Sequence, residues 1–219
     1  MFDRKVLKSE TVYNEIKELI ITNTLKQGTH LSERNLSESL GASRTPIRDA
    51  LKKLAYEQFV DSTPEYGNIV SKVTYEQVFQ IYDIREMLEA LAVRLFTSQA
   101  SENQLEEIAR IYSRLHDSTE IREYKTSLQI DLKFHSYIYT RTKNLQLQRM
   151  LDSIFEHTRR ILIITRYTDS WAEESLDQHH SLLNYIISRD IQAAEKEMMN
   201  HVRNSKRHQL EQLLTNKIG

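Results

Sequence analysis

The sequence contains no cysteine, and only 4 of its 219 residues are glycine and 2 are proline. Without cysteine there is no disulfide framework and no thiolate metal or redox site. So few glycines and prolines argue against a β-sandwich or barrel, which needs many tight turns, and favour helices. No apolar run approaches the roughly 20 residues of a membrane-spanning helix, and the N-terminus lacks the apolar core of a signal peptide. We therefore expect a cytoplasmic protein with no membrane partner.

The chain also has little net charge, because 30 Lys and Arg stand against 31 Asp and Glu, which gives −1 at pH 7. Residues 1–70 are neutral by themselves, with ten side chains of each sign. Since nucleic-acid-binding proteins are often strongly basic, any affinity for DNA must come from where the cations are placed. One segment departs from the balance, with four cations and one acid: Arg44, Arg48, Lys52, Lys53 and Asp49.

This basic segment has the pattern of a short helix that could enter a DNA major groove. Ser43 and Pro46 are typical of a helix start, and the serine hydroxyl is expected to cap the helix. Arg44 and Arg48 lie four residues apart and so project from one face. The opposite face is apolar, with Ile47, Ala50, Leu51 and Leu54. Arginines on a helix with a buried back can read guanine edges, although solvated helix charges would look the same in isolation.

The neighbouring segments complete a known motif. Residues 10–24 and 33–40 are two further predicted helices, the second capped by Ser32 and ended by Gly41. Two short β-prone runs follow as a predicted hairpin, or wing: residues 59–61 and 68–70, with Gly67 at the tip. Helix, glycine-containing turn, helix and hairpin together predict a winged helix-turn-helix.

From residue 75 onward every segment has helical periodicity. Six successive helices predict an all-α bundle, and the boundary with the first domain falls near residues 70–74. We therefore predict a mainly α protein, with a winged helix-turn-helix domain at residues 1–73 and a helical bundle at 74–219. The six predicted helices and their three suggested N-caps are 75–99, 102–117, 123–140, 145–167, 171–188 and 191–214, with Asn144, Ser170 and Asp190.

The predicted bundle holds a second group of candidate residues. Asp131 and His135 are four residues apart and leave one helix face together. His201, and either His179 or His180, follow on two other helices among apolar neighbours; periodicity does not separate the last two. Three imidazoles and a carboxylate would suit Zn²⁺, Ni²⁺ or a similar divalent ion. Spacing alone does not bring them together, and any one histidine is better explained as an ordinary core or surface residue.

The N-terminal residues resemble the winged helix of GntR-family bacterial transcription regulators over three segments: Leu31–Leu36, Leu40–Leu51 and Pro64–Gly67. Two departures are that Gln58 stands where the family usually has glycine, and that the wing tip is less basic than usual. The resemblance implies that Arg44 or Arg48 reads a guanine and that Arg34 supports it from the preceding helix. Ser43 and Thr45 are candidate phosphate ligands at the helix start, and Gly67 lies in the wing. The candidate DNA-binding residues are therefore Arg34, Ser43, Arg44, Thr45, Arg48 and Gly67.

The C-terminal residues resemble the FCD subfamily of these regulators, in Asp131–His135, in Asn144–Leu145, and in His179 and His201, each eleven residues from Asp190. The resemblance implies a metal held by one Asp and three His, selects His179 over His180, and implies a carboxylate effector at the open coordination positions. Arg85 is a candidate cation for that effector, although its spacing from Glu89 also fits an ion pair at the helix surface or core edge. Asn144 is a second candidate effector-binding residue.

These observations favour a ligand-responsive transcription regulator that binds a near-palindromic operator as a homodimer through its helical domain. Two alternatives use the same residues differently. In one, the helical domain is a metal-dependent enzyme, but the sequence offers no general acid or base at a persuasive spacing, so we expect no enzyme activity. In the other, the metal ion is itself the signal.

Overall fold

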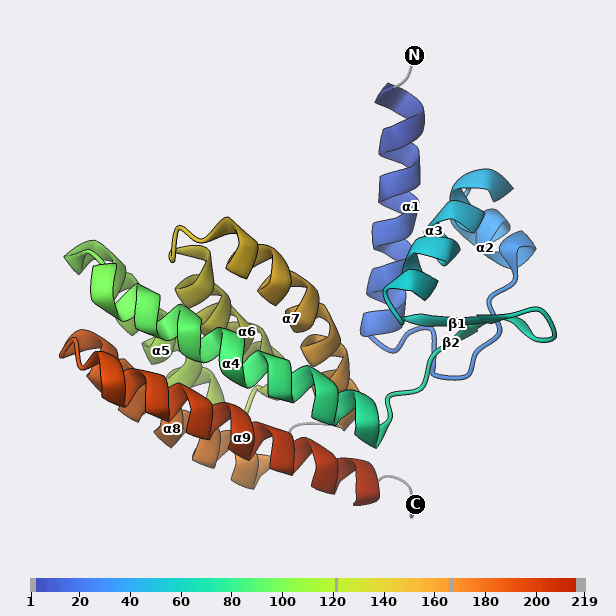
Figure 1. The fold of residues 1–219 in the computed structure, drawn as a ribbon. Coiled ribbons are helices and arrows are strands. Elements are labelled where there is room, and N and C mark those ends of the chain that lie inside the picture. Colours follow the sequence, from blue (N-terminus) through green and yellow to red (C-terminus); the bar gives the residue numbers. More distant parts are fainter. Residues whose placement is uncertain (1–2, 121, 166–167, 216–219) are drawn as a thin grey trace. The chain divides into compact units, whose positions relative to one another are not determined.

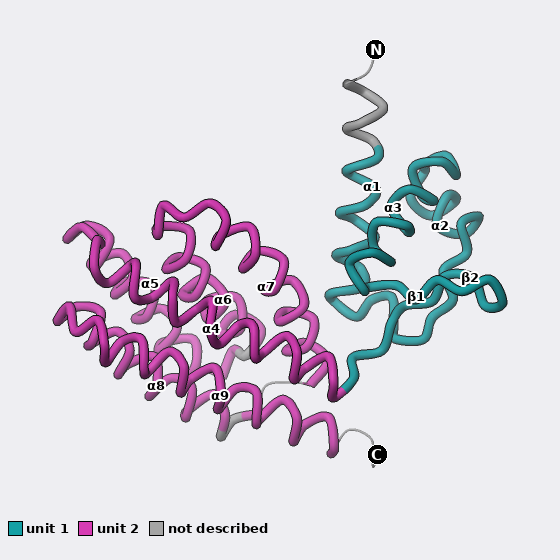
Figure 2. Tube along the Cα trace, viewed as in Figure 1, with its two compact units in different colours: residues 1–74 teal, residues 75–219 magenta. Residues whose placement is uncertain are grey.

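The computed structural model describes residues 3–120, 122–165 and 168–215. The chain divides into two compact units, residues 1–74 and 75–219 (Figure 2). Each unit has its own buried apolar core. The predicted fold class, a small winged domain followed by a helical bundle, is confirmed.

Unit 1 is a three-helix domain with a two-stranded wing (Figure 1). Its side-chain core lies where α3 packs against α1 and α2, and each fully buried Ile or Leu there stabilises the fold by roughly 1.5–3 kcal/mol. The elements are α1 (Asp3–Ile21), α2 (Glu33–Ser39), α3 (Arg44–Tyr56), β1 (Val60–Thr63) and β2 (Gly67–Val70).

The predicted bounds of the first helix, residues 10–24, were wrong at both ends. Hydrophobic periodicity locates only the buried part of a helix, and the turns before it carry no such signal. The helix ends three residues early, and Asn23 beyond it has a φ of 57°, in the left-handed region. The buried stripe consists of Val12, Ile16 and Ile20, which are spaced four residues apart.

The two ends of α2 and the start of α3 follow the predicted capping chemistry in part. Ser32 caps α2 by accepting a hydrogen bond from the amide of Asn35 at 3.4 Å. Gly41 follows the C-cap with a φ of 58°, a conformation that glycine adopts without strain. Ser43 occupies the N-cap position of α3, but its exposed hydroxyl makes no capping hydrogen bond, so that part of the prediction was wrong.

The wing is an antiparallel pair that runs from Val60↔Val70 to Thr63↔Gly67. Gly67 therefore begins β2, one residue past the turn at the tip. Its φ is 67°, and a Cβ there would lie 3.2 Å from Nε2 of His30, so this position favours glycine on two grounds. Gln58 also has a positive φ, of 63°, a conformation that is strained for a residue with a Cβ.

Unit 2 is a bundle of long helices in which α4 and α9 lie side by side along their length (Figure 1). Ion pairs join their exposed edges, with Asp83–Lys206 at 2.6 Å and Glu86–Arg203 at 2.7 Å. None of the described helices is long and apolar enough to cross a membrane. The helices are α4 (Tyr75–Gln99), α5 (Glu102–Glu120), α6 (Tyr124–Thr140), α7 (Leu145–Thr165), α8 (Asp169–Ile187) and α9 (Ile191–Thr215).

Two of the three predicted caps in this unit are present. Asn144 Oδ1 accepts from the amide of Leu147 at 3.1 Å and caps α7, and Asp190 Oδ1 accepts from the amide of Ala193 at 3.0 Å and caps α9. Ser170 was wrong, because α8 begins earlier, with Thr168 as its N-cap. The predicted end of the fourth bundle helix, at residue 167, lies outside the described residues.

Candidate functional site

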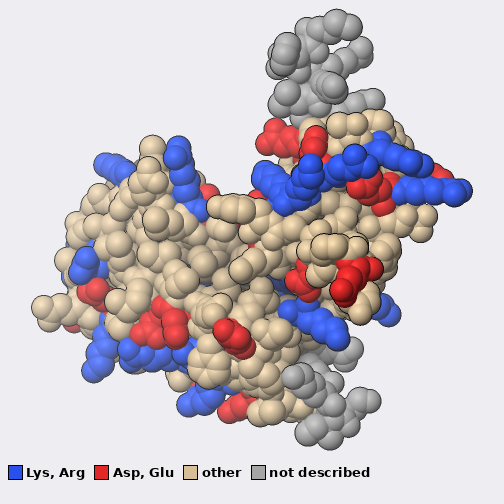
Figure 3. Space-filling model, turned by 45° about the vertical axis from the view of Figure 1, so that its right-hand side comes forward, with Lys and Arg blue, Asp and Glu red and all other residues tan. Residues whose placement is uncertain are grey.

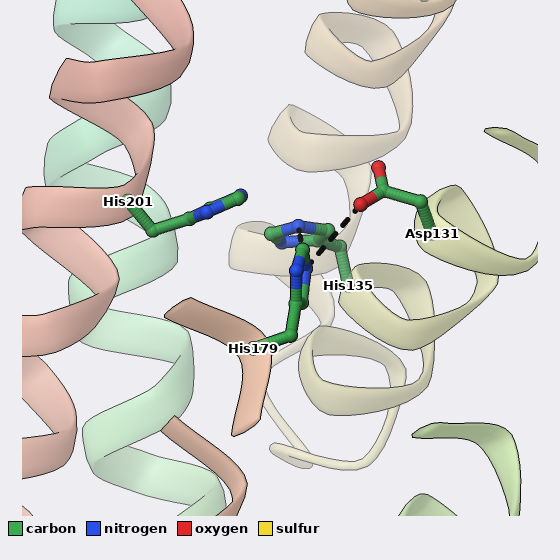
Figure 4. A group of neighbouring side chains, drawn as sticks. All are labelled: Asp131, His135, His179 and His201. Carbon is green, nitrogen blue, oxygen red and sulfur yellow. Dashed lines mark hydrogen bonds and ion pairs between the residues drawn. The ribbon is translucent and has the colours of Figure 1, made fainter. Parts of the chain in front are cut away.

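Helices α6, α8 and α9 bring four candidate ligands together inside unit 2 (Figure 4). Asp131 and His135 come from α6, His179 from α8 and His201 from α9, and all four side chains are buried. Each offers one ligand atom, and these atoms all lie within 4.8 Å of one another. The two rings of His135 and His179 and the Asp131 carboxylate point toward a common centre in Figure 4. These are the four residues that the family resemblance named as candidate ligands.

Burial distinguishes the two adjacent histidines of α8, His179 and His180. His179 is fully buried in the cluster, whereas His180 is exposed and lies 3.2 Å through Nδ1 from the hydroxyl of Tyr112. One residue along a helix is a rotation of about 100°. The structure therefore brings His179, and not His180, to the other ligands.

Each of the three imidazoles has its Nδ1 beside an acceptor. His179 Nδ1 donates to the backbone carbonyl of Ser175 at 2.6 Å, and His135 Nδ1 donates to the carboxylate of Glu89. His201 Nδ1 lies 2.9 Å from Oε1 of Gln178. Such partners orient the ring and select the tautomer that leaves Nε2 as a metal ligand.

The distances between ligand atoms fit one divalent ion. Nε2 of His179 lies 3.2 Å from Nε2 of His135 and 3.3 Å from Oδ1 of Asp131. Metal–ligand bonds of about 2.0–2.2 Å at tetrahedral angles place neighbouring ligand atoms about 3.3–3.6 Å apart. Because burial lowers the pKa of His179 to about 4, its imidazole is neutral, and with Nδ1 donating to Ser175 its Nε2 carries the lone pair that a cation would bind. Ligand types and distances therefore fit a metal.

Glu89 is the functional residue that sequence reasoning missed. Arg85 and Glu89 are both only 2% exposed and form an ion pair, so the surface position considered for them was wrong. Burial alone would raise the pKa of Glu89, but Arg85 and His135 overcome it and hold that pKa at about 2. The carboxylate therefore stays ionised and joins Arg85 to the candidate metal ligand His135. The only signal in the sequence was an i, i+4 charge pair on a helix with apolar neighbours.

The two candidate effector-binding residues have other partners in the structure. The Arg85 guanidinium is bound to Glu89 and lies 5.2 Å from the ring centres of both Tyr82 and Phe155. The Asn144 side chain caps α7. Arg85 is thus linked to the cluster through the Glu89 carboxylate, whereas the Asn144 side chain has a structural role.

The candidate DNA-binding residues of α3 lie on the surface of unit 1. Lys and Arg form a band across this unit, with Asp and Glu beside them (Figure 3). Ser43, Arg44 and Thr45 are exposed at the start of α3. Among the described residues Arg44 forms no hydrogen bond or ion pair, so its guanidinium is free to bind a base or phosphate.

The other two candidate arginines are each paired with a glutamate of α2. Arg48 binds Glu33 through Nε at 2.9 Å and Nη2 at 2.8 Å. Arg34 binds Glu38 through Nε at 2.9 Å, with both side chains exposed. Of the three candidate arginines, two are thus paired with carboxylates and Arg44 is not.

Two family models match the chain, one to each unit. Residues 8–70 match "Bacterial regulatory proteins, gntR family", and residues 80–204 match "FCD domain". An HTH-type transcriptional regulator of Bacillus subtilis, YdhC, is 27% identical over 90% of this chain and 88% of its own. The HTH-type transcriptional repressor RspR of Escherichia coli is 26% identical over 89% of this chain and 85% of its own.

The fold is similar to that of a solved regulator. The structure of E. coli McbR/YncC superimposes with a TM-score of 0.79 at 23% sequence identity, covering 94% of this chain and 98% of that one. Both matched families and these relatives are transcription regulators rather than enzymes. The chain therefore belongs to the GntR family of bacterial DNA-binding transcription regulators, in the group that carries an FCD domain.

Proposed function

We propose that this regulator binds a near-palindromic operator as a homodimer and responds to a small carboxylate effector at a divalent metal ion, Zn²⁺ or Ni²⁺. Asp131, His135, His179 and His201 would hold the ion. The observation that carries this proposal is the buried convergence of these four ligands, with an acceptor beside each Nδ1. A bound ion would supply Lewis acidity toward a carboxylate oxygen at any coordination position that the protein leaves open.

The residues around the cluster would position and enclose such a ligand. Phe134 packs edge-on against His179 at 5.0 Å between ring centres, and Phe155 lies 5.9 Å from His135. Glu89 fixes the ring of His135 from α4, the helix that directly follows residue 74. A ligand that prefers one placement of His135 would therefore also bias α4, which is how an effector could shift operator affinity.

Trp171 provides a direct test, because it is the single tryptophan of the chain and is buried next to the cluster. Its ring stacks at 25° on His201, 6.3 Å away between centres. Ni²⁺ quenches a nearby indole, whereas Zn²⁺ has a filled d shell and does not. Titrating the apoprotein with Ni²⁺ should quench the fluorescence at one equivalent per chain, and pre-loading with Zn²⁺ should prevent it.

Three outcomes of this titration separate the hypotheses. A folded protein that shows no saturable quenching would remove the metal from the proposal. Quenching together with a change in operator affinity from metal alone would favour the metal-sensor alternative. Operator affinity that changes only when a carboxylate such as acetate or citrate is added to the loaded protein supports the proposed effector response.

The homodimer is proposed from the outer face of α4. Ile84 and Met87 are 49% and 62% exposed there, and Leu88 and Leu91 beside them are half-buried. The spacing 84, 87, 88 and 91 is one continuous apolar stripe on a helix. A second copy of the chain would cover this stripe with the same stripe, as a two-fold interface requires.

Replacing Met87 and Ile84 together by glutamate should therefore convert the dimer to monomer. Four carboxylates would then meet in the apolar interface, where burying an unpaired charge costs several kcal/mol. Light scattering after size-exclusion chromatography measures the mass. Ser98→Glu is the matched control, because it adds a charge at an exposed position of the same helix. A double variant that remains dimeric would place the interface elsewhere.

A further inference from the structure

The ion pair of Glu33 and Arg48 joins two neighbouring helices and holds a candidate DNA-binding arginine. Glu33 is the first residue of α2, Arg48 is the fifth residue of α3, and the two are joined by two hydrogen bonds. We propose that Glu33 is a positioning residue for DNA recognition, which holds the Arg48 guanidinium in the orientation that reads a guanine. This inference rests on the proposed role of Arg48 in base contact.

The donor pattern of arginine supports this role. A guanidinium has five N–H groups, and Glu33 takes one from Nε and one from Nη2. Both N–H groups of Nη1 and one of Nη2 remain, and they lie at the end of the side chain. A bidentate contact with O6 and N7 of guanine needs two parallel N–H groups of this kind. Glu33 thus binds the guanidinium from the side, at Nε and Nη2, and leaves the terminal N–H groups for the base.

The position of Glu33 suits it to hold the Arg48 side chain in place. Its side chain is 28% exposed, whereas that of Arg48 is 58% exposed, so the carboxylate lies nearer the protein and the cation nearer the solvent. Ser32 caps the same helix end, α2 packs on α3, and Leu36 of α2 is buried. An arginine that is held before binding loses less side-chain entropy when it meets the base.

Glu33 also carries a charge that opposes phosphate. Sequence-independent binding depends on neutralising phosphates with Lys and Arg. A carboxylate beside Arg48 weakens that attraction for every sequence, while the oriented guanidinium regains affinity only where a guanine is present. The expected result is a higher ratio of operator affinity to affinity for random DNA.

The Glu38–Arg34 pair is a matched control. It is also a Glu–Arg pair of α2, but it lies within one helix, bonds through Nε alone in Arg34, and is exposed at both ends. Glu33→Gln and Glu38→Gln remove the same charge from the same helix. Glu33→Asp keeps the charge but shortens the side chain, so that it no longer spans the distance to Arg48.

The experiment is in-vitro selection of operator sequences from duplexes with a randomised core, using the full chain. The affinities of each variant for the selected duplex and for a scrambled one then give the preference. Glu33→Gln should raise affinity for the scrambled duplex and lower the preference about tenfold. Glu33→Asp should lower the preference without raising scrambled affinity. Glu38→Gln should raise both affinities and leave the preference unchanged.

The outcomes distinguish this inference from the proposed base contact of Arg48, on which it rests. If Arg48→Ala keeps the selected guanines, Arg48 does not read a base, and both proposals about it fail. If Arg48→Ala loses them but Glu33→Gln and Glu33→Asp keep the full preference, only the positioning role of Glu33 is overturned. Equal losses of preference in the Glu33 and Glu38 variants would also overturn it, because charge alone would then explain the effect.

Discussion

Arg44→Ala and Arg48→Ala are each expected to abolish operator recognition. A bidentate arginine–guanine contact contributes about 1–3 kcal/mol of discrimination, and a dimer on a palindrome makes it twice. The loss is therefore about 2–6 kcal/mol, which is at least about 30-fold in affinity. Footprinting and fluorescence anisotropy on a duplex selected by the wild-type protein measure it. The effect is large because residues 1–70 have no net charge with which to compensate.

Lys52→Ala is the control for these two variants. Lys52 is an exposed cation of the same helix, so it is expected to act through phosphate alone. Its removal should weaken binding to all sequences similarly and reduce the slope of log affinity against log salt by about one. A protein that still protects the same palindrome after both arginine changes would show that α3 does not read the operator.

His179→Ala is expected to remove the metal ion, and His180→Ala to leave it in place. The two histidines are adjacent, have the same chemistry and differ in burial. A difference in metal content between the two variants would therefore come from the position of the side chain. Elemental analysis of dialysed protein should give about one divalent ion per chain for the wild type and His180→Ala, and none for His179→Ala.

Thermal unfolding gives a second measurement of the same change. A ligand present at about 100 times its Kd stabilises the folded state by about 2.7 kcal/mol, so metal should raise the Tm of the wild type and of His180→Ala. The Tm of His179→Ala should not respond to metal. Metal retained by His179→Ala but lost from His180→Ala would reverse the assignment. Wild-type protein that is folded and metal-free after purification in metal-containing buffer would reduce these histidines to core residues.

Local sequence signals predicted much of unit 1. The helix-turn-helix depends on caps, a glycine and an apolar stripe that all lie within about a turn or two of one another, and Ser32, Gly41 and Leu51 serve as expected. The failures were also local. Ser43 makes no capping bond, and the first helix begins earlier than its buried stripe, because neither feature has a strong sequence signature.

The bundle was predictable as six helices but not as a site. The periodicity of α6 showed that Asp131 and His135 leave one face, and the family resemblance named the remaining ligands. What the periodicity did not contain was the packing of α6 against α8 and α9. His180 fitted the apolar pattern nearly as well as His179, and only the packed bundle separates a buried ring from an exposed one.

The sequence by itself determined the identities of the chemical groups and their order along each helix: the arginines of α3, the ligand types of the cluster and the absence of any thiolate. Tertiary structure alone decided which groups meet. Glu89 reaches His135 across 46 residues, and Glu33 reaches Arg48 across 15. The physical reason is that side-chain periodicity is a property of one helix, whereas contacts between helices depend on how several apolar faces pack at once.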